Sequence, residues 1–298
     1  MTADHVPPPG TIVVGVDGSA ESDLAVRWAA EQAALEGRAV SLVHGVGLGN
    51  GGWGDFYGLG NQSVIEARRS QGQDLLDAAE ILSHNIAPEA RTRTFLELAD
   101  PRLALLELAE RAALVVVGAR GKGPVARLLL GSVSMALTRH APCPVVVLRP
   151  EQPAGEGRGV LVGVDGRGAS TTALEFAFRH ASLRSLPLTV LHCFDVGAAT
   201  GVEILAYDSP GLEDERLVLD ETVAGMGEKF SDVPLTLALA RGPSDDCLVA
   251  ASKEMDLLVV GAHPRQTLIG LVLDPHVDRA MAERSPVAVA VVPEPAES

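Results

Sequence analysis

LVVVGARGKGPVARLLLGSVS, residues 114–134, is the stretch of sequence on which the prediction of the fold depends. It opens with an apolar, β-branched run at 114–117, which is typical of a buried strand. Glycines follow at Gly118, Gly121 and Gly131 in the spacing G-x2-G-x9-G-S. The residues after the last of these glycines have the pattern of a helix. The stretch therefore predicts a strand, a glycine-rich loop and a helix in succession.

Each part of this loop can bind a phosphate. Glycines let backbone N–H groups approach an anion closely, and successive N–H groups form an anion-binding concavity. The helix that begins near Gly131 adds unpaired donors at its N-terminus. Ser132 and Ser134 add hydroxyl groups, and Arg120 and Lys122 add positive charge. A glycine-rich surface turn would explain the glycines alone, but the combination favours phosphate binding.

The composition indicates large cores in an acidic protein. The chain has 298 residues, enough for two domains, and 47% of them are hydrophobic. Aromatic residues make up only 3%, so the cores must consist of valine, leucine, isoleucine and alanine, which suits helices packed on a buried parallel sheet. A net charge of −15 argues against nucleic acid or an anionic membrane as a general partner.

Cysteine usage and the N-terminal residues suggest a cytoplasmic location. Cys143, Cys193 and Cys247 have neither the pairing of a disulfide framework nor the spacing of a zinc site, so we expect buried, small apolar side chains. Residues 1–10 are polar and proline-rich, unlike a signal peptide, and are expected to form a loose arm. No apolar run reaches the ~18 residues of a membrane helix. We expect a soluble protein in the cytoplasm.

The first half of the chain alternates strands with helices. Ser19 or Ser22 can cap the first helix, Gly37 ends it, and Asp100 with Pro101 is a typical helix start. Strands are predicted at 11–17, 39–46, 91–98, 114–117 and 142–148, and helices at 19–36, 63–86, 100–111 and 131–140. Residues 47–60 are rich in glycine and contain three aromatic residues, which predicts a mobile loop and a candidate lid.

The same order then starts again. Asp165 lies 148 residues after Asp17 within matching strands, and His192 lies 148 residues after His44. Gly261 follows a strand that matches the one before Gly118. A repeat of this length indicates two tandem domains, 1–150 and 151–298, with a linker at 150–158.

Each half predicts an α/β, doubly wound parallel sheet with right-handed crossovers. Ligands of such sheets bind beyond the carboxyl ends of the strands, where the strand order reverses. Asp17 ends the first strand and Gly118 ends the fourth, so the two face one crevice if these strands are neighbours. A carboxylate beside a phosphate loop suggests a ribose or base contact. The alternative is that Asp17 only caps the next helix.

These motifs resemble the universal stress protein family. VVGVDGS, SLVH, the 114–134 stretch and PCPVVVL carry the resemblance, which covers both halves and nearly the whole chain. It implies Rossmann-like sheets of five parallel strands in the order 3-2-1-4-5. It also implies binding of ATP, often with a divalent metal such as Mg²⁺ or Mn²⁺.

Site residues and partners follow from the same resemblance. Asp17 should contact adenosine, and the backbone near Gly45 should contact adenine. Ribose and phosphates should be held by Gly118, Arg120, Gly121, Gly131, Ser132, Val133 and Ser134. In relatives the last strands of two domains pair, so 145–148 and 287–292 are candidates for pairing within the chain or in a homodimer.

The second half departs from the motif. Pro264, Asp274, Pro275 and Val277 stand where the first half has Gly121, Gly131, Ser132 and Ser134. The two prolines remove backbone donors, and Asp274 places a negative charge near a phosphate. We expect the second domain to bind ATP weakly or not at all.

No catalytic motif accompanies the predicted site. The P-loop spacing is absent, and His44 and His192 lie inside apolar strands, where structural histidines are expected. We therefore expect a nucleotide-dependent stress or growth regulator that acts on an unidentified protein partner and is not an enzyme. A slow ATP-hydrolysing enzyme and a nucleotide-free interaction module remain alternatives. A dinucleotide oxidoreductase is a weaker one, because no G-x-G-x-x-G follows the first strand.

Overall fold

The chain forms two compact units, residues 1–150 and 151–298. The computed structural model describes residues 7–47, 62–121, 130–150, 159–165, 171–194, 201–262 and 277–294. Each unit is described by itself below, as the first unit and the second unit.

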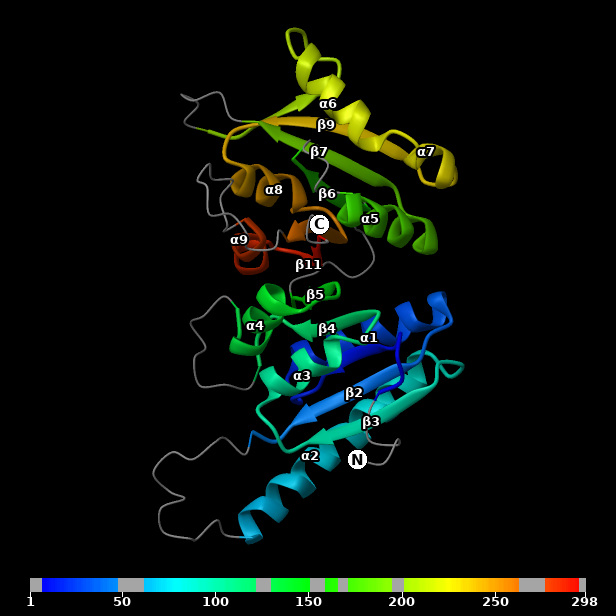
Figure 1. Cartoon of the computed structure of the whole chain (residues 1–298), viewed down its shortest axis with the longest axis vertical. Helices are drawn as coiled ribbons and strands as arrows, with labels where there is room; N and C mark the ends of the chain where they lie inside the picture. The colour runs from blue at the N-terminus through cyan, green and yellow to red at the C-terminus, as the bar shows by residue number, and fades with distance from the viewer. Residues whose placement is uncertain are drawn as a thin grey trace. The chain divides into compact units, whose positions relative to one another are not determined.

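The first unit contains a sheet of five parallel strands (Figure 1). The strands are β1 (Ile12–Gly15), β2 (Val40–Gly45), β3 (Thr92–Glu97), β4 (Leu114–Gly118) and β5 (Val145–Leu148). Their order is β3-β2-β1-β4-β5, which confirms the predicted order 3-2-1-4-5. Because β1 has β2 on one side and β4 on the other, the strand order reverses at β1, as the sequence analysis required for a shared crevice.

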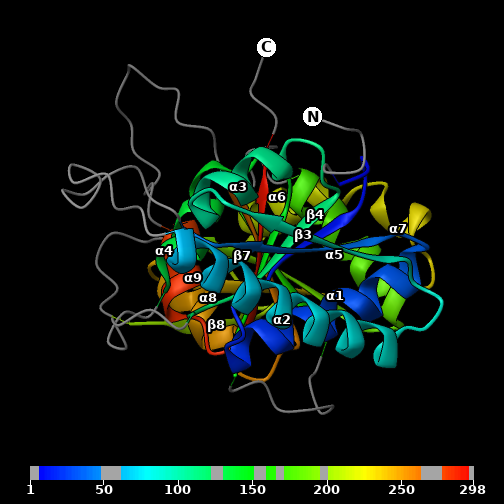
Figure 2. The ribbon, with the colours of Figure 1, turned by 90° about the horizontal axis from the view of Figure 1, so that it is seen from below.

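Four helices cover the two faces of this sheet. They are α1 (Ala20–Glu36), α2 (Gln62–Ile86), α3 (Pro101–Ala109) and α4 (Ser132–His140). Helices α1 and α2 pack together on one face, and α3 and α4 pack together on the other (Figure 2). Both faces are therefore covered, which explains why β1, β4 and β5 are continuously apolar, whereas the edge strand β3 keeps polar residues.

The helix ends follow the capping residues in the sequence. The Ser19 hydroxyl accepts a hydrogen bond from the backbone N–H of Ser22 at 3.1 Å, so Ser19 caps α1. Gly37 ends α1 with a φ of +64°, which glycine adopts without steric cost. Asp100 caps α3 by accepting from the N–H of Arg102 at 2.9 Å, and Pro101 is the first helical residue, as predicted.

The second unit repeats the topology and adds a strand. Its strands are β6 (Val160–Val164), β7 (Leu188–Phe194), β8 (Glu203–Ala206), β9 (Leu235–Arg241), β10 (Leu257–Ala262) and β11 (Ala288–Pro293). The parallel strands follow the order β9-β7-β6-β10-β11, equivalent to 3-2-1-4-5. The short strand β8 pairs antiparallel with β9 and was not predicted, because its apolar run of three residues is too short to indicate a buried strand.

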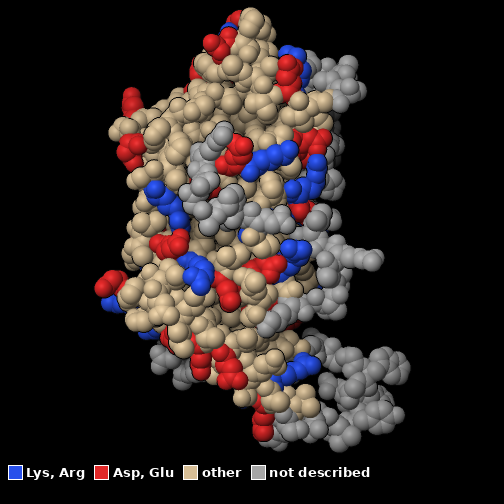
Figure 3. All heavy atoms as spheres, turned by 180° about the vertical axis from the view of Figure 1, so that it is seen from behind, with Lys and Arg blue, Asp and Glu red and all other residues tan. Residues whose placement is uncertain are grey.

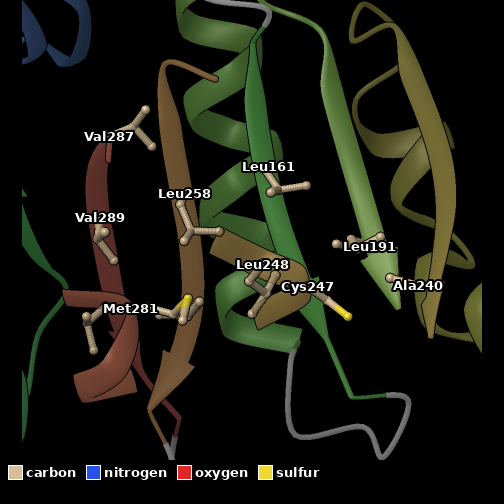
Figure 4. Packing of buried hydrophobic residues seen from close by; sticks show 11 residues of the cluster. Leu161, Leu191, Ala240, Cys247, Leu248, Leu258, Met281, Val287 and Val289 are labelled. Atoms are coloured by element: carbon tan, nitrogen blue, oxygen red, sulfur yellow. The ribbon is translucent and has the colours of Figure 1, made fainter. Parts of the chain in front are cut away.

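Five helices of the second unit are described. They are α5 (Thr171–Arg184), α6 (Glu213–Val223), α7 (Met226–Lys229), α8 (Ser244–Ser252) and α9 (Val277–Arg284). Helices α8 and α9 pack together, and the core beneath them includes aliphatic side chains from β6, β7, β9, β10 and β11, together with Cys247, Leu248 and Met281 of the two helices (Figure 4). The low aromatic content of the sequence therefore leads to a core of leucine, valine and alanine.

The three cysteines carry free thiols. Cys143 and Cys247 are buried as predicted, whereas Cys193 at the end of β7 is partly exposed. Burial raises the pKa of the Cys143 thiol to about 12, so this thiol stays protonated at neutral pH.

Acidic residues outnumber basic residues in the sequence, 39 to 24, and both kinds lie on the surface. Acidic and basic side chains alternate over the face shown in Figure 3. None of the helices in the described part of the chain is long and apolar enough to cross a membrane.

Several predicted features lie outside the described residues. They are most of the arm at 1–10, the loop at 47–60 except Gly47, the linker at 150–158 except Pro150, and Lys122, Pro264, Asp274 and Pro275.

Candidate functional site

A pocket of about 320 Å³ lies at the carboxyl ends of the first unit's strands. Its volume is within the range of roughly 300–1,000 Å³ that is typical of small-molecule sites. The pocket is lined by all nine residues predicted for the site: Asp17, Gly45, Gly118, Arg120, Gly121, Gly131, Ser132, Val133 and Ser134. The fold thus brings together residues that are up to 117 positions apart in the sequence.

Asp17 has two roles in the geometry of the pocket. One of its carboxylate oxygens, Oδ1, accepts hydrogen bonds from the backbone N–H and the hydroxyl of Ser19, at 2.9 and 2.6 Å. These bonds fix the turn between β1 and α1, but the residue that caps α1 is Ser19, so Asp17 holds the cap residue in place and does not itself cap the helix. The other oxygen, Oδ2, lies against Gly121, where a Cβ would be only 2.2 Å away. A turn contact and a place in the pocket are therefore compatible.

Two of the pocket glycines are required by helix packing. A Cβ on Gly118 would lie 2.6–3.0 Å from Glu21, including its backbone carbon and oxygen, at the start of α1. A Cβ on Gly45 would lie 2.6 Å from the Cα of Pro101, the first residue of α3. The sequence analysis explained both glycines by contact with a ligand, whereas the structure shows that they also let α1 and α3 approach the strand ends.

The end of the glycine loop leaves the start of α4 uncapped. Gly131 is the N-cap residue of α4 and, having no side chain, makes no side-chain cap hydrogen bond. Its own N–H donates to the carbonyl of Ala119 at 2.7 Å. Ser132 and Val133 then line the pocket at the first turn. An anion in the pocket would meet backbone donors and the positive end of the helix dipole.

The two loop serines have different surroundings. The Ser134 hydroxyl donates to the carbonyl of Gly118 at 2.7 Å, and its side chain is buried. Its proton is therefore committed to holding α4 against β4 and is not available to a phosphate in this arrangement. Ser132 is exposed at the pocket wall, so its hydroxyl is the better candidate for a phosphate contact.

Arg120 supplies positive charge beside the loop. Its side chain is 44% exposed, and its Nε lies 3.4 Å from the Oε1 of Glu21. An exposed ion pair of this kind contributes about 0–1 kcal/mol, so it would not prevent Arg120 from turning toward a more highly charged anion.

The opposite wall of the pocket contains residues that the sequence analysis did not assign to the site. They include Val16, Val43, His44, Pro101 and Leu105. His44 Nδ1 donates to the carbonyl of Val16 at 2.7 Å, which fixes the ring beside the pocket and agrees with its predicted structural role. Proximity to Gly45 in the sequence could have indicated His44, but Pro101 and Leu105 reach the pocket only through the packing of α3.

In the second unit, the histidine that corresponds to His44 has a glutamate beside it, where the first unit has a glycine. His192 Nδ1 donates to the carbonyl of Val164 at 3.2 Å, and its Nε2 lies 3.0 Å from the Oε2 of Glu215 on α6. In the first unit, Gly72 of α2 takes the place beside the histidine, where a Cβ would be 2.7 Å from His44 Cδ2. Both histidines are thus hydrogen-bonded to a backbone carbonyl, and within the described part of the chain His192 also has an acidic partner.

The described residues offer no evident protein site for a metal. Nowhere within the described ranges do three His, Cys, Asp or Glu side chains gather closely enough to hold an ion.

Comparisons with known proteins agree with the fold and the repeat. Residues 9–149 and 158–293 each match the universal stress protein family. Universal stress protein Rv2005c of Mycobacterium tuberculosis is 33% identical over 287 residues, which cover 94% of this chain and 96% of the relative. Universal stress protein Rv2623 of the same species is 34% identical over 290 residues, covering 94% and 95%.

A solved structure covers both units. The crystal structure of a universal stress protein from Archaeoglobus fulgidus DSM 4304 superposes with a TM-score of 0.71 at 16% identity, covering 95% of this chain and 98% of that chain. This likeness concerns the fold. Together with the two matching segments and the relatives of similar length, it leads to one conclusion: the chain belongs to the universal stress protein family.

Proposed function

We propose that the first unit binds ATP and that the protein is a cytoplasmic, nucleotide-dependent regulator of stress responses or growth. The observation that carries this proposal is the pocket at β1 and β4, which combines the glycine loop with the uncapped start of α4. Backbone donors at a helix N-terminus beside glycines suit a polyphosphate because they need no rearrangement to meet it.

The two walls of the pocket suit the two ends of a nucleotide. Val16, Val43, Pro101 and Leu105 provide an apolar wall against which a purine ring can pack. The loop residues at the other side provide polar groups for ribose and phosphates. When bound, Mg²⁺ or Mn²⁺ would neutralise phosphate charge, while Arg120 and the α4 N-terminus hold the anion.

The proposed role is regulation and not turnover. Hydrolysis requires a positioned base or metal-bound water near the terminal phosphate. Asp17, the carboxylate that lines the pocket, has one oxygen engaged in the turn with Ser19. A regulator would transmit occupancy of the pocket to a protein partner, or through pairing of last strands in a homodimer, which stays a prediction.

The number of bound nucleotides tests the proposal directly. We expect the purified, denatured protein to release one ATP per chain, or the nucleotide-free protein to bind one ATP in calorimetric titration with Mg²⁺. ATP at about 100 times its Kd should stabilise the protein by about 2.7 kcal/mol. Two ATP per chain would contradict the expectation for the second unit, and no binding would contradict the proposal itself.

Ser132→Ala tests the contact between loop and phosphate. Removing a hydroxyl that bonds a charged group costs about 1.5–3 kcal/mol, so we expect ATP to bind at least tenfold more weakly. Ser70→Ala, the same change at an exposed position on α2 away from the pocket, is the matched control. Equal affinities of both variants for ATP would show that Ser132 makes no phosphate contact.

A further inference from the structure

Two thiols of the second unit lie next to each other, although 53 residues separate them in the chain. Cys193 is near the carboxyl end of β7, and Cys247 is in the first half of α8. The two thiols lie close enough for each to shift the pKa of the other. Cys193 also packs against the apolar cluster of which Cys247 is a member.

The strand geometry explains this contact. Successive side chains of a strand point to opposite faces, and His192 points to α6, where it meets Glu215. Cys193 therefore points to the other face, which α8 covers. In Figure 4 the sulfur of Cys247 extends from α8 toward β7 and its residue Leu191. Gly242, whose added Cβ would lie 3.4 Å from this sulfur, leaves room around it.

We propose that Cys193 and Cys247 are a modification site at which a hydroperoxide generates an intramolecular disulfide. Residue Cys193 is partly exposed and Cys247 is fully buried, so we assign Cys193 as the thiol that meets the oxidant first. The inference does not depend on ATP binding, because neither thiol belongs to the first unit.

The chemistry needs only the two thiols and the peroxide. The Cys193 thiolate attacks a peroxide oxygen, so that an S–O bond forms, the O–O bond breaks and an alcohol or water leaves. The Cys247 thiolate then attacks the sulfur of this sulfenic acid. An S–S bond forms, the S–O bond breaks and water leaves. Two thiols lose two electrons in total, and the peroxide gains them.

The surroundings make this a slow site that responds to sustained oxidation. Burial raises the pKa of the Cys193 thiol, and so does the neighbouring Cys247. Burial also raises the pKa of Cys247, with a smaller contribution from Asp245 and Asp246. The thiolate is the reactive form, and its fraction grows with pH. The rate of oxidation should therefore rise about tenfold for each unit by which the pH increases, as long as the pH stays below these pKa values.

The crosslink would join the end of β7 to α8. This place in the second unit corresponds to the part of the first unit's pocket wall that contains Gly45. Cys193 lies 148 residues after Gly45, the same interval that separates His192 from His44. At Gly45 the strand end meets α3 through backbone atoms of Pro101. At Cys193 the strand packs against the apolar cluster that contains Cys247 of α8, and a disulfide would make this contact covalent.

Mass spectrometry of the oxidised full chain tests the proposal. The protein is treated with hydrogen peroxide at mildly alkaline pH, alkylated with iodoacetamide and digested. We expect loss of two hydrogens per chain, one crosslinked peptide that joins Cys193 to Cys247, and its disappearance after dithiothreitol. Cys143→Ser, which removes the buried thiol of the first unit, should leave the crosslink unchanged, and Cys193→Ser should abolish it.

Other products would overturn the proposal. One is sulfinic acid at Cys193 while Cys247 can still be alkylated in the unfolded chain. The others are a crosslink that includes Cys143 and a crosslink between two chains. A second readout is the rate at neutral and alkaline pH, since a rate independent of pH would contradict oxidation through the thiolate. Circular dichroism of Cys193→Ser and Cys247→Ser distinguishes a lost crosslink from a lost fold.

Discussion

Gly118→Ala is expected to lower the free energy of unfolding by about 2 kcal/mol, even without nucleotide. The new methyl group would lie 2.6–3.0 Å from Glu21, and two of the three nearest atoms are backbone atoms of α1 that cannot rotate away. Helix α1 must therefore shift from the end of β4. For a unit of this size the thermal midpoint should fall by about 4–8 °C. Calorimetry of the nucleotide-free protein measures the change.

Gly227→Ala is the matched control for this substitution. Gly227 lies in α7, and nothing within 4 Å would contact an added Cβ. The stability of this variant should equal or slightly exceed that of the original protein, because alanine has a higher helix propensity than glycine. If Gly118→Ala kept its thermal midpoint and lost only ATP affinity, Gly118 would be a ligand contact and the packing explanation would be wrong.

This result would also change how Gly118 is used to test function. A variant that displaces α1 also displaces the turn at Asp17 and Ser19, because that turn leads directly into α1. Loss of ATP binding in Gly118→Ala would therefore not distinguish a direct contact from a shifted helix. Ser132→Ala avoids the difficulty, since the side chain of Ser132 is exposed and the substitution makes it smaller.

The order of the elements could be predicted because local signals agreed with each other. Ser19, Gly37, Asp100 and Pro101 mark helix ends by their own backbone chemistry, and the central strands β1 and β4 are continuously apolar. The order 3-2-1-4-5 came from the family resemblance. These signals depend on residues close in the sequence, which is why they could be interpreted without coordinates.

Two features of the site depended on contacts between distant residues. Ser134 looked like a phosphate ligand because it is a hydroxyl in a glycine loop, but its partner is the carbonyl of Gly118. Pro101 and Leu105 looked like an ordinary start of a helix and reach the pocket only because α3 crosses the ends of β1 and β2. No pattern along the chain records such a crossing.

The additional strand of the second unit shows a different limit. β8 has four residues, EILA, and its apolar run of three is shorter than the runs of about four to eight by which a buried strand is recognised in a sequence. Its position is given by the antiparallel register that pairs Glu203 with Arg241 of β9. Pairing of this kind is a property of the partner strand as much as of the segment itself.

Acid should destabilise the second unit through His180. This side chain of α5 is 3% exposed, and burial, with a smaller contribution from Arg184, lowers its pKa to about 3. In the unfolded chain its pKa returns to about 6.5, so below that pH the unfolded state binds a proton that the folded state excludes. The free energy of unfolding should then fall by about 1.4 kcal/mol per pH unit between these two pKa values, and above about pH 6.5 the histidine has no effect.

His180→Gln removes this titration while keeping a polar side chain beside Phe176, on which the imidazole is stacked. Urea unfolding measures the free energy of unfolding at about pH 7 and about pH 5. The decrease between these two pH values should be smaller in the variant than in the original protein by roughly 2 kcal/mol. His84→Gln, at an exposed histidine in the last turn of α2, should leave the difference between the two pH values unchanged. The same pH dependence in His180→Gln as in the original protein would mean that carboxylates, and not the buried imidazole, set the acid limit. A smaller pH dependence in the variant would instead identify His180 as a group that destabilises the folded second unit in mild acid, because it can bind a proton only after unfolding.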